Sequence, residues 1–175
     1  MEINFCRRCG AHVTKQSDGF YVCEHGHHLF YKMYNGVLLA LLNQKNEVLM
    51  IIRGRDPGKG TLDFPGGFMD LGELPMEAVR RETLEETGLT SSSYEPPQFL
   101  CWAIDTYEYQ GETQEVLGAC FWARVKGEVQ PIAGDDAQAV KWATLNEAKD
   151  ADVYSGFAAV RKTLQELRQR FNVES

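Results

Sequence analysis

Residues 67–89 of the chain read GFMDLGELPMEAVRRETLEETGL, and this stretch decides the fold. Within it, residues 75–87 have the composition of a helix, because the proline at their start is tolerated in a first helical turn and an acidic residue follows it closely. Gly88 stands where a helix commonly ends. The sequence therefore predicts one helix over 75–87, preceded by a glycine-rich loop.

Three carboxylates crowd one side of this predicted helix. Glu82, Glu85 and Glu86 are spaced i, i+3 and i+4, and each like-charged pair costs roughly 0.2–0.5 kcal/mol on an exposed helix. A solvated acidic face is one interpretation. The other is a site for a hard divalent cation such as Mg2+, which takes oxygen ligands and shares its shell with phosphates. The preceding residues 65–67 favour the cation site, because glycine removes side chains where backbone carbonyls would approach it, and Arg81 lies four residues before Glu85.

The whole stretch resembles the signature of the Nudix hydrolases. Its fixed residues all occur at the family's spacing: Gly67, Glu73, Arg81, Glu82, Glu85, Glu86 and Gly88. At Thr83 the family usually has an aliphatic residue, and the threonine methyl group can still pack. The resemblance implies an α+β fold, a Nudix-type α/β/α sandwich with a mixed sheet. It also implies a hydrolase that uses Mg2+ or Mn2+ to cleave the pyrophosphate bond of a nucleoside diphosphate linked to another moiety.

The resemblance assigns roles to individual residues. The expected metal ligands are acidic side chains and one backbone carbonyl: Glu82, Glu85, Glu86 and Gly66. Glu73 would support the site, and Arg81 would orient the carboxylates through ion pairs. One more acid from outside the signature would join the metal site, and the candidates are Glu112, Glu115 and Asp136, with Asp136 preferred for its spacing from the strand at Trp142. The general base stays open between Glu86 and this external acid.

Positive residues near the signature are candidate phosphate ligands. Arg53 and Arg55 border the site in sequence and could bind substrate phosphates, while solvated loop charges are an equally good interpretation. The chain carries 18 Lys and Arg against 25 Asp and Glu, a net charge of −7, which argues against a general binder of nucleic-acid backbones. A bound cation would reconcile an acidic protein with an anionic substrate.

Hydrophobic patterning outside the signature predicts strands and a second helix. The expected strands are 36–42, 48–53, 99–109, 114–126 and 140–143. The first two form a buried hairpin, and we expect no regular structure over 55–68. A two-residue turn at 110–111 would place Cys101 opposite Cys120 as neighbouring thiols. The last helix spans 155–171, with an apolar stripe for packing.

Residues 1–31 form a separate unit with too few large apolar side chains for a core of its own. The spacing Cys6-x2-Cys9, followed by Cys23, predicts a structural zinc ribbon on a short hairpin. His27 is the preferred fourth ligand, with His25 and His28 left open. Residues 32–175 would then form the Nudix domain.

A zinc ribbon before a Nudix domain is similar to the arrangement in NADH pyrophosphatases. The histidine ligand departs from the usual cysteine, so the substrate stays open between a dinucleotide such as NADH and ADP-ribose or an ADP-sugar. The alternative function is a non-catalytic module that binds nucleotide, RNA or protein. We expect a small-molecule nucleotide partner, and the net charge of −7 argues against a nucleic-acid partner. We expect a cytoplasmic location and no membrane partner, because no run of ~18 apolar residues or signal peptide is present. A homodimer is left open.

Overall fold

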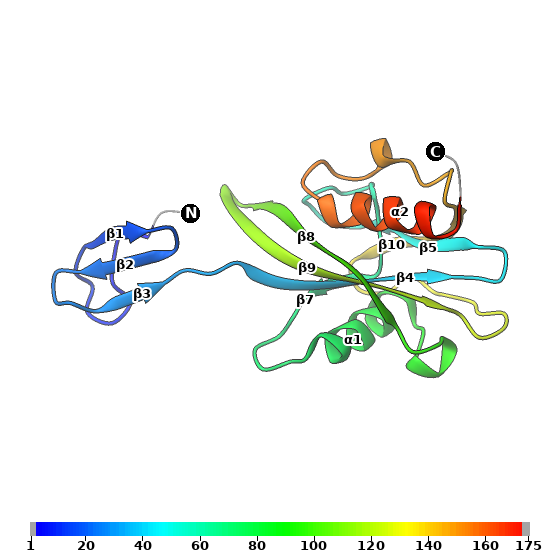
Figure 1. Cartoon of the computed structure of the whole chain (residues 1–175), viewed down its shortest axis with the longest axis horizontal. Helices are drawn as coiled ribbons and strands as arrows, with labels where there is room; N and C mark the ends of the chain where they lie inside the picture. The colour runs from blue at the N-terminus through cyan, green and yellow to red at the C-terminus, as the bar shows by residue number, and fades with distance from the viewer. Residues whose placement is uncertain (1–2, 173–175) are drawn as a thin grey trace.

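A computed structural model describes residues 3–172 of the chain. It contains a small three-stranded sheet near the N-terminus and a larger seven-stranded sheet that lies between two helices (Figure 1). The larger part is a mixed sheet with helices on both faces, which confirms the predicted α+β sandwich. No helix within 3–172 is long and apolar enough to cross a membrane.

The small sheet is antiparallel, with strands in sequence order. Its strands are β1 (Val13–Ser17), β2 (Phe20–Cys23) and β3 (His28–Phe30). The chain turns between β1 and β2 at residues 18–19, with Gly19 at a φ of +70°. The predicted hairpin is extended by β3, because Leu29 pairs with Tyr21 and packs beside the buried Cys6 and Cys23. This small core holds little apolar surface.

The larger sheet has the order β10-β5-β4-β9-β8, with β6 beside β5 and β7 beside β4. Its strands are β4 (Tyr34–Leu42), β5 (Glu47–Arg53), β6 (Leu62–Asp63), β7 (Gly66–Phe68), β8 (Gln98–Tyr109), β9 (Glu112–Arg124) and β10 (Ala137–Thr144). Strands β4 and β9 run parallel, and the other pairs are antiparallel. A short 3-10 turn, η1 (Ser91–Ser93), precedes β8, and a second, η2 (Asp150–Asp152), precedes the last helix.

Helices α1 (Pro75–Thr87) and α2 (Ala158–Arg170) lie on opposite faces of this sheet (Figure 1). The bounds of α1 match the prediction, and Gly88 ends the helix with a φ of 68° while its N–H bonds to the Leu84 carbonyl. Thr83 is completely buried, as its predicted packing requires. The predicted stripe of the last helix is buried at four positions: Phe157, Val160, Leu164 and Leu167.

The predicted β4–β5 hairpin separates after a single pair, Leu42 with Val48. The gap between the two strands is filled by β6 and β7, so the prediction of no regular structure over 55–68 is wrong. The reason is the close approach that glycine allows, since a Cβ on Gly66 would collide with the Val37 carbonyl oxygen of β4. This insertion carries Gly67 to the face of the sheet that α1 covers.

The β8–β9 hairpin has the predicted two-residue turn, with positive φ at Gln110 and Gly111. Cys101 lies opposite Cys120 in the register, as predicted, and both are free thiols. A register shift between Phe99 and Cys101 displaces the pairing by one residue toward the start of β8.

Candidate metal and substrate site

Helix α1 presents its acidic side chains to β7 and the loop that follows it. The start of the helix is fixed by Glu77, whose carboxylate accepts a hydrogen bond from the Leu74 N–H at 2.9 Å. Glu82 and Glu86 face inward, and their side chains are mostly shielded from solvent, whereas the Glu85 side chain is 44% exposed. The i, i+3, i+4 spacing therefore gives two shielded carboxylates and one at the rim of the site.

Arg81 is the hub of the carboxylate cluster. Its Nε and Nη2 donate to both oxygens of Glu73 at 2.9 Å, and its Nη1 donates to Glu82 at 2.7 Å and Glu85 at 3.2 Å. Nη2 also donates to the Phe68 carbonyl at 3.0 Å, which ties the helix to β7. The bonds from Arg81 lower the pKa of Glu73 to about 2. The arginine thus fixes three carboxylates in one arrangement.

Glu86 is the most buried acid of the cluster, at 5% exposure. Its Oε2 accepts a hydrogen bond from the Gly66 N–H at 2.8 Å, and Glu86 has no ion-pair partner among residues 3–172. Burial raises the pKa of Glu86 to about 9. A buried carboxylate with so little compensation needs either a proton or a cation.

Gly67 lies against the carboxylate of Glu82. A Cβ at this position would sit 2.5 Å from Glu82 Oε1, so only glycine lets the strand and the acid meet without displacement. Burial also raises the pKa of Glu82, although Arg81 opposes the shift. Arg81 pairs with three acids of the cluster, and Glu86 adds a fourth carboxylate beside them. A hard divalent cation fits this surplus of oxygen ligands.

The structure gives the two predicted phosphate-binding arginines other partners. Arg53 Nη1 donates to Asp63 at 2.8 Å, and its guanidinium lies 4.7 Å from the ring centre of Phe157. Arg55 forms ion pairs with Asp135 and Asp136. These partners fix the position of each guanidinium and leave further N–H groups of both arginines available to a phosphate.

Asp136, the preferred external acid, is therefore bound to Arg55. Its loop packs on the end of α1, where the Gly134 N–H donates to the Glu86 carbonyl at 3.1 Å. The loop therefore lies next to α1, and the role of Asp136 at the metal site stays a prediction. The other two candidates, Glu112 and Glu115, lie near the start of β9, where their charges help to raise the pKa of Tyr31.

A pocket that the sequence reasoning missed opens on the α2 side of β7. Its lining includes Gly66, Gly67 and Phe68 of β7 together with Asp63 and Asp105. The sequence offered one weak signal, an aspartate between the apolar residues Leu62 and Phe64. No sequence pattern indicated Asp105, because its neighbours in the pocket come from β7 and α2, which are distant from it in the chain.

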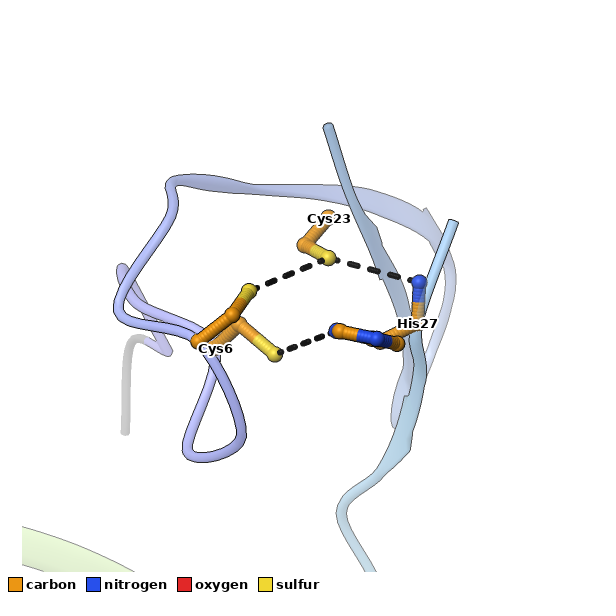
Figure 2. A group of neighbouring side chains, drawn as sticks. Cys6, Cys23 and His27 are labelled. Carbon is orange, nitrogen blue, oxygen red and sulfur yellow. Dashed lines mark hydrogen bonds between the residues drawn. The ribbon is translucent and has the colours of Figure 1, made fainter. Parts of the chain in front are cut away.

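The N-terminal cysteines converge on one point. The ligand atoms of Cys6, Cys9, Cys23 and His27 all lie within 4.8 Å of one another. Cys6 Sγ is 3.6 Å from His27 Nδ1, and the His27 N–H donates to Cys23 Sγ at 3.3 Å (Figure 2). A tetrahedral zinc ion fits this set of three thiols and one imidazole.

The two other candidate histidines lie differently. His25 Nδ1 is 3.4 Å from Cys9 Sγ, at the edge of the cluster. His28 meets the ring of Phe20 edge-on at 5.4 Å. The geometry favours His27 as the fourth ligand.

Comparison with known proteins identifies similar domains. A family model described as NUDIX domain matches residues 33–167. The chain is 42% identical over 62 residues to the ADP-ribose pyrophosphatase of Methanocaldococcus jannaschii, covering 34% of this chain and 37% of that protein. It is 30% identical over 104 residues to the 8-oxo-dGTP diphosphatase of Escherichia coli, covering 59% and 74%. It is 29% identical over 89 residues to the NAD-capped RNA hydrolase NudC of Haemophilus influenzae, covering 49% and 34%.

Solved structures with the same fold cover more of the chain. A NUDIX hydrolase from Nitrosomonas europaea aligns with a TM-score of 0.65 at 21% identity, covering 98% of this chain and 94% of that one. The NUDIX domain of Shewanella oneidensis NrtR, solved with ADP ribose, aligns with a TM-score of 0.65 at 20% identity, covering 81% and 90%. At these low sequence identities, the similarity to the two structures shows a shared fold and nothing about activity.

Proposed function

The chain belongs to the NUDIX domain family, and on that premise we propose that it is a Mg2+-dependent hydrolase that cleaves the pyrophosphate bond of a nucleoside diphosphate linked to another moiety. The observation that carries the proposal is the buried Glu86 beside Glu82 and the arginine-held Glu85. This arrangement is costly without a cation. A protein that only bound nucleotide would gain nothing from it.

The residues proposed to hold the cation are the three helix acids and the carbonyl of Gly66. When bound, Mg2+ or Mn2+ would neutralise charge that develops on the diphosphate oxygens. Arg81 keeps the carboxylates of Glu82 and Glu85 in place, and Glu73 in turn holds Arg81 through two hydrogen bonds. Catalysis of this kind depends on fixed geometry, because the protein must present its ligands without reorganisation.

A carboxylate must accept the proton of the attacking water. Glu86 and Asp136 are the two proposed bases. Glu86 lies at the centre of the cluster, shielded from solvent and hydrogen-bonded to β7. Asp136 would first have to leave Arg55. Separate replacement of the two residues by amide analogues, with activity followed against pH, assigns the role.

We propose nucleoside diphosphate derivatives as the substrate class: a dinucleotide such as NADH, or ADP-ribose and ADP-sugars. The names of similar proteins support this class, since they include an ADP-ribose pyrophosphatase and NAD-capped RNA hydrolases. The matching segments span only part of these relatives: 37% of the ADP-ribose pyrophosphatase and 34% of NudC.

We further propose that residues 1–31 form a ribbon that a structural zinc ion stabilises through the Cys6, Cys9, Cys23 and His27 cluster, and that residues 32–175 form the catalytic domain. The small core around Leu29 is too limited to stabilise this unit alone. Zinc supplies the missing stability when its four ligands close around it.

One assay tests the proposed reaction. The full chain is incubated with Mg2+ and a panel of NADH, ADP-ribose, ADP-sugars, CoA esters and nucleoside triphosphates, and the products are separated by chromatography. We expect cleavage within the diphosphate bridge of at least one member, abolished by EDTA and restored by Mg2+. Binding without cleavage across the panel would instead favour the non-catalytic alternative.

A further inference from the structure

The pocket on the α2 side of β7 is separated from the carboxylate cluster only by the backbone of residues 66–67. Gly66 donates its N–H toward Glu86 on one side and lines the pocket on the other. β7 pairs with β4 and is also tied to α1 by the Gly66–Glu86 and Arg81–Phe68 hydrogen bonds. If the proposed function places a diphosphate at the carboxylates, this adjoining pocket can take the rest of the substrate.

Aromatic rings form one wall of the pocket. The rings of Phe68 and Tyr107 meet at 5.3 Å and 75°, and the rings of Tyr107 and Phe157 lie 6.3 Å apart at 15°. The Phe68 side of this wall is open, since that residue is 40% exposed. Flat heteroaromatic rings stack on such surfaces, and each stacked base contributes to affinity.

Two carboxylates, Asp63 and Asp105, line the pocket together with one cation, Arg53. Asp63 is paired with Arg53 at 2.8 Å. Asp105, from β8, accepts the Ala159 N–H at 2.7 Å and has no ion-pair partner within the described part of the chain. The two acids are close enough for the charge of Asp105 to affect Asp63. The pocket therefore holds one more carboxylate than cations.

An ionised carboxylate accepts hydrogen bonds and donates none, so it selects a base edge made of N–H donors. Guanine offers N1–H and N2–H side by side, whereas adenine, cytosine and uracil place a ring nitrogen or carbonyl acceptor next to any donor. Arg53 uses two N–H groups on Asp63 and Pro57, and a guanidinium carries five, so it can also donate to guanine O6. We propose that this pocket binds the guanine base of a guanosine diphosphate derivative, stacked on Phe68 and recognised by Asp105.

This inference rests on the proposed function for the position of the diphosphate, yet base recognition can be measured without hydrolysis. Calorimetric titration of the wild-type chain with GMP, IMP and AMP, all with Mg2+, compares three bases on the same phosphate. We expect GMP to bind about tenfold or more tightly than AMP, and IMP to be weaker than GMP because it lacks the N2 amino group. Equal affinity for GMP and AMP overturns the inference, whatever the hydrolysis panel shows.

Asp105→Asn is the decisive variant. The asparagine oxygen can still accept the Ala159 N–H, so the start of α2 is retained while the carboxylate is lost. We expect GMP affinity to fall about tenfold and AMP affinity to change little, which removes the preference. Glu108→Gln, an exposed acid on the same strand, is the matched control and should leave both affinities unchanged. A preference for GMP that survives Asp105→Asn would show that Asp105 does not read the base.

Hydrolysis separates this inference from the proposed function. Cleavage of GDP-sugars faster than ADP-sugars supports the pyrophosphate hydrolysis and the guanine pocket, and it replaces the adenine nucleotides proposed above as substrates. Selective GMP binding with no cleavage of any diphosphate supports the pocket and contradicts the proposed function. Cleavage with no preference among bases supports the function and contradicts the pocket. If Asp105→Asn fails to fold, the wild-type comparison of GMP, IMP and AMP still decides.

Discussion

Gly66 donates its backbone N–H to Glu86 Oε2 across 2.8 Å, and this bond joins β7 to α1 across 20 residues of chain. It is the one direct polar link that the structure gives the Glu86 carboxylate among the described residues. The bond holds the Glu86 carboxylate beside Gly66 of β7, whereas Arg81 holds Glu82 and Glu85. The cluster is thus fixed from two directions.

The first prediction concerns Glu86→Gln. The amide oxygen can still accept the Gly66 N–H. Because the pKa of Glu86 is raised, the wild type must bind a proton there when it folds at pH 8, whereas glutamine is already neutral, so we expect the metal-free variant to be at least as stable as the wild type at pH 8. Turnover with Mg2+ should fall by about two orders of magnitude or more. Thermal unfolding and product formation measure the two effects. Glu95→Gln, on the exposed surface, is the control. Wild-type turnover in Glu86→Gln would remove Glu86 from the metal site.

The second prediction is a pH dependence from the Glu73–Arg81 pair. The pKa of Glu73 is lowered from about 4.5 to about 2, so the ionised form stabilises the fold above pH 4.5, and this stabilisation is lost as the pH falls toward 2. We expect the wild type to unfold at a higher temperature than Glu73→Gln at pH 7, with the difference shrinking between pH 4.5 and 2. A difference that stays constant over this range would show that the ion pair is not its cause.

The third prediction compares two neighbouring glycines. A Cβ at Gly66 meets the backbone of β4, so Gly66→Ala should destabilise the fold by roughly 1–3 kcal/mol. A Cβ at Gly67 meets only the Glu82 side chain, so Gly67→Ala should keep most of the stability and lose Mg2+-dependent turnover as Glu82 is displaced. Thermal unfolding and turnover of both variants test the contrast. The same loss of stability in both would refute it.

The fourth prediction concerns the cysteine cluster. His27→Ala should lower the zinc content of the purified chain and expose residues 1–31 to protease, because the tetrahedral set loses a ligand. His28→Ala is the matched control, since its ring packs on Phe20 away from the cluster. Atomic absorption and limited proteolysis measure the outcome. If His27→Ala kept its full zinc content and His25→Ala lost zinc, the fourth zinc ligand would be His25.

Local signals in the sequence predicted the elements that have local causes. Pro75 and Gly88 set the ends of α1, and the turn residues at 110–111 set the β8–β9 register. The separation of β4 from β5 was missed, because it depends on β6 and β7, which follow later in the chain and fill the gap between the two strands. No periodicity within residues 36–53 carries that information.

The candidate site, too, has contacts that the sequence predicted and contacts that it did not. The signature placed four acids and Arg81 in one cluster because most of them share a helix, and the structure brings them together. The partners of Arg53 and Arg55 could not be foreseen, since Asp63 and Asp136 meet them only through the pairing of β5 with β6 and β10. The metal roles of these residues remain predictions.

The parallel ladder between β4 and β9 has a consequence for biosynthesis. It joins positions 34 and 116, so the ribosome completes α1 well before the strand that closes the sheet has left the exit tunnel. Until then, helix α1 of the nascent chain has no completed sheet to pack against. Pairing at such long sequence separation slows folding, so the proposed cation would bind at a late stage of maturation.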